Sequence, residues 1–313
     1  MMFLEKVPMP VAGVALAVAT LGGLFRLYGF EVRPVLGIVS AVLLALPLLQ
    51  CLCVRGQFSR YMSSPVMASI IGTFSMAVIV LSGYLRLFSG TLAFVVFLIG
   101  GVLHTLLIGW FTCRFLFKVP VSGMLTSWFI LYVGYAVLSI VSPVFGLQET
   151  LGQWIFWFSL AMYLVLMPFM VWRYWIFRGI PEPAKPLVCI YAVPPALCLA
   201  AYLQIVAEPA AWLVWLLAAL SFTSLVGVVC FLPGLLRLSF YPSYAAFTFP
   251  FAISAMAGRL LELFCINAGG MALVWHWIAV CQTVLASALT AYVLLRYLMA
   301  IARGTAEGKP AGG

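Results

Sequence analysis

Ten apolar runs, each long enough to cross a lipid bilayer as a helix, divide almost the whole sequence. We predict transmembrane helices at residues 8–27, 35–54, 65–85, 90–112, 120–142, 151–172, 186–206, 210–232, 241–264 and 271–299. About 20 apolar residues in a helix span the hydrocarbon core, and such a helix satisfies its own backbone polar groups. Charged residues make up 7% of the chain, against about 25% in soluble domains. The sequence therefore predicts an all-α polytopic membrane protein of ten helices.

Short connections between the runs leave no room for a separate soluble domain. We expect one transmembrane domain over residues 1–300 and a short disordered cytoplasmic tail over residues 301–313. The net charge of +9 is distributed over the loops of a protein surrounded by lipid, so we expect no nucleic acid partner.

The basic residues predict an orientation in the membrane. If the N-terminus lies inside, twelve of the sixteen basic residues fall on the inner side: Lys6, Arg55, Arg60, Arg114, Lys118, Arg173, Arg178, Lys185, Arg237, Arg296, Arg303 and Lys309. Loops rich in lysine and arginine stay on the cytoplasmic side. We therefore expect a protein of the plasma (inner) membrane with both termini in the cytoplasm.

A proline opens every odd-numbered run, at a nearly constant interval. These residues are Pro8, Pro65, Pro120, Pro186 and Pro242, with gaps of 57, 55, 66 and 56. A second sign of an internal repeat is the similarity between LGGLFRL, which begins at Leu21, and LSGYLRL, which begins at Leu81, 60 residues later. Prolines are common in first helical turns, which is the simpler explanation of the first pattern. The period favours five parallel helical hairpins in a ring, with the odd-numbered helices facing the axis.

The residue types exclude several classes of enzyme. The chain has no aspartate, which membrane enzymes that hold a metal pyrophosphate, and aspartyl proteases, require. Glu262 is the one acid placed to act within the bilayer, and Arg259 lies three residues earlier on the same helical face, so we predict an ion pair. We predict interhelical hydrogen bonds for His104 and His276. We expect no enzyme activity, no metal and no cofactor.

The run 241–264 carries Pro250 in its body, directly after Phe249. Pro250 removes a backbone donor and leaves the carbonyl near Ala246 without its usual partner. Lipid tolerates such a fault only where neighbouring helices or a wet cavity satisfy it. Phe249 is therefore a candidate for lining or closing a path through the membrane. The alternative is that Phe249 packs against a neighbouring helix and Pro250 bends the segment. Pro194 is a second candidate for a backbone break.

Hydroxyl side chains in the odd-numbered runs are candidates for lining a pore, among them Ser75, Thr126 and Thr248. Hydroxyls and freed helix ends hold an anion weakly without a buried positive charge. Taken singly, each hydroxyl also has the alternative of bonding to its own helix. With the basic inner ends, the set favours passage of an anion over passage of a cation.

Five segments carry a resemblance to a known family: PMPVAGVALAVATLG, SSPVMASIIGTFSMAV, VPVSGMLTSWFILYVG, PLVCIYAVPPALCLAAYL and YAAFTFPFAIS. Over essentially its whole length the chain resembles the tellurite-resistance/dicarboxylate transporter family. That family includes fungal malate and sulfite transporters and the slow anion channels of plant guard cells.

The resemblance implies ten helices as five hairpins around a quasi-fivefold central pore, in a homotrimer whose subunits each have their own pore. It also implies that the phenylalanine of the ninth-run motif, Phe249 here, plugs the pore. Where family members carry internal prolines in runs one and three, this chain has Gly13 and Gly72. With Pro194 and Pro250, these glycines are the candidates for shaping the pore. The implied function is transport of small inorganic anions or dicarboxylates.

Two other functions stay open at this point. A drug or metabolite permease would consist of two inverted halves of five helices, at residues 1–150 and 151–313. A lipid-modifying membrane enzyme would need a polar cluster at one interface. The sequence leaves the carried anion and the choice between a channel and a proton-coupled carrier undetermined.

Overall fold

The computed structural model describes residues 4–176 and 179–303, and in this part of the chain every regular element is a helix. The α-helices are α1 (Val11–Leu27), α2 (Arg33–Cys53), α3 (Gln57–Ser63), α4 (Pro65–Ile70), α5 (Gly72–Leu85), α6 (Gly90–Phe111), α7 (Trp128–Tyr132), α8 (Ala136–Val141), α9 (Gln153–Ile176), α10 (Val193–Ile205), α11 (Ala211–Leu235), α12 (Phe249–Asn267) and α13 (Ala272–Arg303). The 3₁₀ helices are Leu4–Lys6, Val121–Gly123, Ser142–Phe145, Glu182–Ala192 and Pro242–Phe247, and the π-helical turns are Thr112–Leu116 and Gln148–Gly152.

These elements form ten apolar spans, as predicted. Within the described residues nine continuous stretches are long and apolar enough to cross a membrane, and α1 is a shorter apolar helix. Six of these stretches join two or more consecutive helical elements: Pro65–Leu85, Gly90–Leu116, Trp128–Phe145, Gln148–Tyr174, Glu182–Ile205 and Pro242–Asn267. Helix α13 ends at Arg303, and residues 304–313 of the expected tail lie outside the described residues.

The odd-numbered spans are inside the bundle and the even-numbered spans surround them. In spans three, five, seven and nine, 67% to 83% of the apolar stretch is buried, against 28% to 39% in the five even-numbered spans. In α1, thirteen of seventeen residues are buried. In a permease of two inverted halves, spans six, eight and ten would be the counterparts of spans one, three and five. Those spans would then be buried in place of seven and nine. The outer helices keep large apolar side chains exposed, as lipid contact requires, for example Leu106, Trp157 and Phe231.

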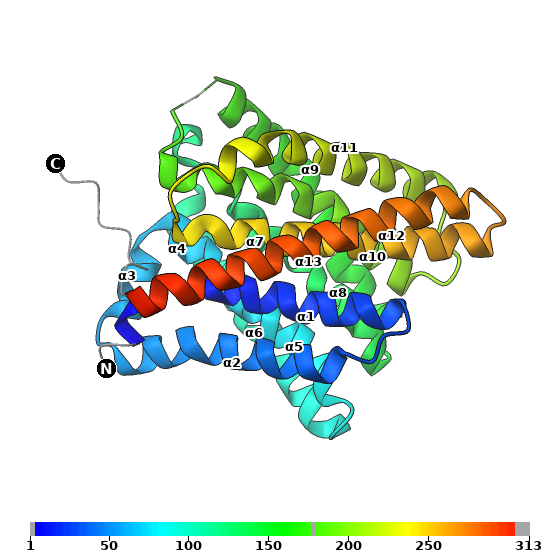
Figure 1. The fold of residues 1–313 in the computed structure, drawn as a ribbon, viewed down its shortest axis with the longest axis horizontal. Coiled ribbons are helices and arrows are strands. Elements are labelled where there is room, and N and C mark those ends of the chain that lie inside the picture. The colour runs from blue at the N-terminus through cyan, green and yellow to red at the C-terminus, as the bar shows by residue number, and fades with distance from the viewer. Residues whose placement is uncertain (1–3, 177–178, 304–313) are drawn as a thin grey trace.

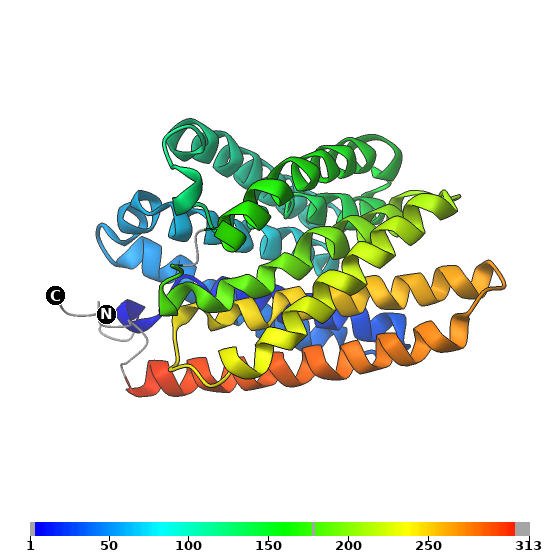
Figure 2. The ribbon, with the colours of Figure 1, turned by 90° about the horizontal axis from the view of Figure 1, so that it is seen from above.

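The inner spans form a closed ring, in which α1 packs on α5, α5 on α8, α8 on α10, α10 on α12, and α12 again on α1. Each inner span also packs against the outer helix that follows it in the chain. Figures 1 and 2 show the long helices running along one common direction, with the start of α1 and the end of α13 at the same end. We call this the terminal end, and the other the opposite end.

The fifth run differs most from its predicted bounds. The sequence predicts a helix from residue 120, whereas the first α-helical residue is Trp128, after the 3₁₀ turn Val121–Gly123. Pro120 is extended, with ψ 157°, and Met124 has ψ 140°. An apolar pattern does not distinguish helix from extended chain that packs against the end of the bundle, so this boundary was misplaced.

Candidate pathway through the inner ring

Four of the five inner spans change their helix geometry part-way along. The changes fall at Ile71, at residues 133–135, between Ala192 and Val193, and at Thr248. Prolines accompany two of them, because Pro194 and Pro195 open α10 and Pro250 lies in the first turn of α12. Proline has no N–H to donate and is accommodated in a first helical turn.

Glycines accompany the other two changes. The Gly134 N–H donates to the carbonyl oxygen of Phe129 at 2.8 Å, and a Cβ at this position would collide with the carbonyl oxygen of Ile130. A Cβ at Gly72 would lie 2.9 Å from Cδ2 of Leu131. Gly72 thus allows α5 to approach α7 closely. Gly134 was missed at the sequence level, although its place in the middle of an apolar run is the signal for a break.

A small cavity of about 40 Å³ lies where the inner spans meet, and we call it the central cavity. All five spans contribute to its lining: Pro10, Gly13, Ile70, Thr73, Met76, Ile130, Leu187, Ile190, Val193, Ser243, Ala245, Ala246, Phe249 and Pro250. The lining is almost entirely apolar, and Thr73 turns its hydroxyl to the carbonyl oxygen of Ile70 at 2.8 Å. An ion in this cavity would therefore find few groups to replace its water.

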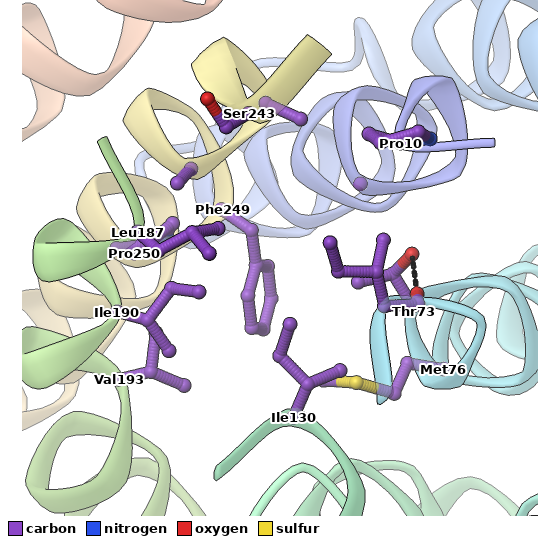
Figure 3. A pocket seen from close by; sticks show the side chains of 14 residues that line it. Pro10, Thr73, Met76, Ile130, Leu187, Ile190, Val193, Ser243, Phe249 and Pro250 are labelled. Atoms are coloured by element: carbon purple, nitrogen blue, oxygen red, sulfur yellow. Dashed lines mark hydrogen bonds between the residues drawn. The ribbon is translucent and has the colours of Figure 1, made fainter. Parts of the chain in front are cut away.

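The side chain of Phe249 projects into the central cavity from the start of α12. Figure 3 shows its ring between Ile190 and Val193 on one side and Thr73 on the other, pointing toward Ile130. Its exposed fraction is 6%. The residue before it, Thr248, has ψ −77° at the junction of the 3₁₀ helix and α12. The junction between the 3₁₀ helix and α12, next to Pro250, therefore places the phenyl group of Phe249 across the axis of the five inner spans.

A larger cavity of about 420 Å³ lies on the opposite-end side of Phe249, and we call it the vestibule. Its lining comes from the five inner spans and from the first residue of α2: Ala19, Thr20, Gly23, Arg26, Leu27, Arg33, Val80, Gly83, Tyr84, Val137, Ile140, Val141, Val144, Gln204, Phe249, Ile253 and Met256. Phe249 is the one described residue that lines both cavities. Neither lining includes an acidic residue among the described positions, whereas Arg26 and Arg33 line the vestibule.

The three hydroxyls singled out in the sequence line neither cavity. Ser75 lies 2.7 Å from Nδ1 of His104, Thr126 donates to the carbonyl oxygen of Leu187 at 2.6 Å, and Thr248 donates to that of Ala245 at 2.7 Å. All three are buried. Their role as pore-lining groups stays a prediction. In this structure they join segments of the ring to one another or to their own backbone.

The proposed pore-shaping residues are divided between the cavity and the packing behind it. Gly13 and Pro250 line the central cavity. Gly72 and Pro194 lie behind the lining, Gly72 against Ile130 and Leu131, and Pro194 buried at the start of α10.

His104 connects the outer helix α6 to two inner spans, as the predicted interhelical bonding requires. Its side chain is fully buried, with Nδ1 2.7 Å from Oγ of Ser75 and Nε2 2.8 Å from the carbonyl oxygen of Leu131. A carbonyl only accepts, so Nε2 carries the proton and Nδ1 accepts from the serine hydroxyl. The Leu131 carbonyl lies just before the break at Gly134. His104 therefore satisfies a backbone group of the broken span.

The predicted ion pair between Arg259 and Glu262 is present at the opposite end, with 2.5 Å between Nη1 and Oε1. The same carboxylate oxygen lies 2.8 Å from Nδ1 of His276 on α13. Arg259 also donates from Nε and Nη2 to the carbonyl oxygen of Leu27, and its guanidinium lies 4.5 Å from the ring centre of Tyr28, whose pKa is raised by burial. This polar cluster joins α12 to α13 and to the end of α1.

Comparison with protein-family models identifies the family of this chain. A model of the voltage-dependent anion channel family matches residues 7–298, which reach from just before α1 into the last helix. A search of curated proteins found no match. The ring of five inner spans, the cavities along its axis and a family match that includes all ten spans agree, and the chain belongs to the voltage-dependent anion channel family.

Proposed function

We propose that this protein is an anion channel in which the ring of Phe249 closes a pore running along the axis of the five inner spans. One observation carries the proposal: Phe249 is the residue shared by the linings of the central cavity and the vestibule. Membership of an anion channel family supports the transported class.

The size and polarity of the central cavity support closure in this conformation. An ion that entered a space of about 40 Å³ with apolar walls would lose most of its hydration shell. Without replacement hydrogen bonds, that loss costs several kcal/mol or more for a charged group. Hydrophobic constrictions of this kind close channels by excluding water. Rotation of the ring toward the vestibule, which has about ten times the volume of the central cavity, would open the path.

Charge at the vestibule supports an anion as the permeating ion. Arg26 and Arg33 line it, and no acidic side chain does among the described residues. A cleft with charges of one sign between low-dielectric walls concentrates ions of the other sign. A cation would meet repulsion there without a carboxylate to offset it.

Replacement of Phe249 tests the gate. We expect Phe249→Ala to raise anion conductance in a planar bilayer at least tenfold, because the variant removes the side chain that fills the axis. Phe251→Ala is the matched control, since Phe251 lies on the same helix, is 1% exposed and lines neither cavity. Both proteins are first checked for monodisperse elution. Equal conductance of wild type and Phe249→Ala would rule out the gate.

The substrates we propose are small inorganic anions or dicarboxylates. A flux assay in proteoliposomes with chloride, nitrate, sulfite and malate, with and without a pH gradient, tests this range. Flux that is independent of the gradient supports a channel, and flux that requires it supports a proton-coupled carrier.

We also propose that both termini face the cytoplasm of the inner membrane and that the protein is a homotrimer, as the family resemblance implies. The excess of basic residues on the terminal side supports the orientation. In a variant that keeps the exposed Cys53 as its one cysteine, an impermeant thiol reagent should label intact cells only after permeabilisation. Native mass spectrometry should give three chains, and a monomer or dimer would refute the trimer.

A further inference from the structure

We infer that the vestibule contains a binding site for a small monovalent anion, centred on the guanidinium of Arg33, in the cavity that Phe249 also lines. The inference rests on the proposed function in one respect, because the vestibule is one side of the proposed pore. Binding itself is measurable without conduction.

Arg33 is the one vestibule residue that an outer helix supplies. It is the first residue of α2, at the end of the turn that follows α1, whereas every other lining residue belongs to the inner spans. Its guanidinium lies 4.4 Å from the ring centre of Tyr84. The ring is held in place because the Tyr84 hydroxyl donates to the carbonyl oxygen of Ala19. The chain thus fixes a cation at a defined place in the cavity wall.

The charge on Arg33 has no paired carboxylate. The ion pairs found among the described residues both use Glu262, and Arg33 takes part in neither. The nearby Glu31 is exposed. The Arg33 side chain is half-buried, and its buried Nε makes no hydrogen bond. Tyr84 hydrogen-bonds the guanidinium and the charge of Glu31 acts on it, but no carboxylate pairs with it directly. Partial removal of such a charge from water costs free energy, and a bound anion would recover part of it.

Two glycines lie in the vestibule wall, and one of them, Gly83, lies beside this guanidinium. A Cβ at Gly83 would lie 3.4 Å from Nη2 of Arg33, and a Cβ at Gly23 would lie 3.3 Å from Cε of Met256. Both glycines line the vestibule. They are the paired positions of the two similar segments LGGLFRL and LSGYLRL. The similarity between these segments therefore corresponds to two small residues in the wall of one cavity.

The surroundings of Arg33 favour a monovalent ligand. Much of the wall is aliphatic, from Val137, Ile140 and Val141, and the Gln204 side chain is an additional polar group in the lining. Arg26 is exposed, so water already solvates its charge. One half-buried guanidinium offsets one negative charge, and a dianion would place its second charge against aliphatic walls at a large desolvation cost.

Chloride binding to the purified, detergent-solubilised protein tests the site directly. We expect the protein to broaden the chloride NMR line in a saturable way, nitrate to reverse the broadening, and malate to leave it unchanged. Loss of a charge-assisted contact should weaken the affinity of Arg33→Gln for chloride about tenfold. Arg86→Gln is the matched control, because Arg86 is an exposed arginine at the same end that lies 6.0 Å from the Phe145 ring and does not line the vestibule.

Three results would overturn the inference: chloride affinity in Arg33→Gln equal to wild type, an equal loss in Arg86→Gln, or displacement of chloride by malate more readily than by nitrate. Arg33→Lys serves if Arg33→Gln fails to fold. Lysine keeps the charge but lacks the planar fork of donors, so affinity should again fall, and unchanged affinity in a folded Arg33→Lys protein would also refute the site.

Conduction separates the two proposals. Chloride binding that depends on Arg33, in a protein whose Phe249→Ala variant carries no anion current, would leave the site standing and refute the channel. Anion current in Phe249→Ala with chloride affinity unaffected by Arg33→Gln would leave the channel standing and refute the site.

Discussion

At Gly134 a missing side chain determines how the fifth span is built. The Cβ of any other residue would collide with the carbonyl oxygen of Ile130 and lie 2.8 Å from Sδ of Met76, which lines the central cavity. Near this break, the carbonyl oxygen of Leu131 accepts a hydrogen bond from Nε2 of His104. One glycine therefore sets both the backbone geometry of the span and the position of a cavity wall.

We expect Gly134→Ala to lower the free energy of unfolding by about 2–4 kcal/mol, because the backbone has to shift to make room for the added Cβ. Gly109→Ala is the matched control. Gly109 lies in α6 with nothing within 4 Å of an added Cβ, so alanine should stabilise that helix by up to about 1 kcal/mol. Thermal unfolding in detergent compares the two variants. A Gly134→Ala protein as stable as wild type would contradict the steric argument.

The candidate site was predictable from the sequence only where a local signal existed. Phe249 stands next to Pro250, and a proline within an apolar run marks a backbone fault whatever the tertiary structure. The hydroxyls of Ser75 and Thr126 gave no such signal, because their partners, His104 and Leu187, are distant in sequence. Arg33 lies between the predicted helices at residues 8–27 and 35–54, and nothing local indicates that the first residue of α2 lines a cavity of the inner ring.

At the scale of the elements, the order of inner and outer helices followed from the sequence. Regularly spaced prolines predicted parallel hairpins with odd-numbered helices inside, and the buried shares of the spans confirm this order. Helix breaks were predictable at Pro194 and Pro250, and partly at Gly72. The start of the fifth span was not, because Pro120 and Gly123 lie in extended or 3₁₀ backbone that is as apolar as the helix after it.

The contact between α12 and α13 depends on one carboxylate. We expect Glu262→Ala to lower the free energy of unfolding by about 3–5 kcal/mol, since it leaves the mostly buried Arg259 without its partner. His276→Gln should cost less, because 40% of the His276 side chain is exposed and water can replace its contact. Thermal unfolding of the two variants and of the double variant measures the coupling. Equal losses for both single variants would contradict this ranking.

At the scale of the whole molecule, the closed ring of five inner spans agrees with membership of the voltage-dependent anion channel family, and Phe249 lies between the two cavities of that ring. All five walls of the proposed pore, its gate and its basic vestibule come from residues 10–256 of a single chain. The even-numbered helices surround this axis and carry the more exposed apolar side chains.

The closed ring of inner spans has a genetic consequence. If the proposed pore is correct, one polypeptide supplies the complete conduction path, and we expect a defective copy to leave the current of an intact copy unchanged. When wild type and Phe249→Ala are co-expressed in varying ratios, we expect macroscopic current to rise linearly with the fraction of Phe249→Ala chains. A steeper, cooperative dependence would mean that subunits open together. If the current rises linearly, we expect loss-of-function alleles to be recessive or additive in dosage, with no dominant-negative effect.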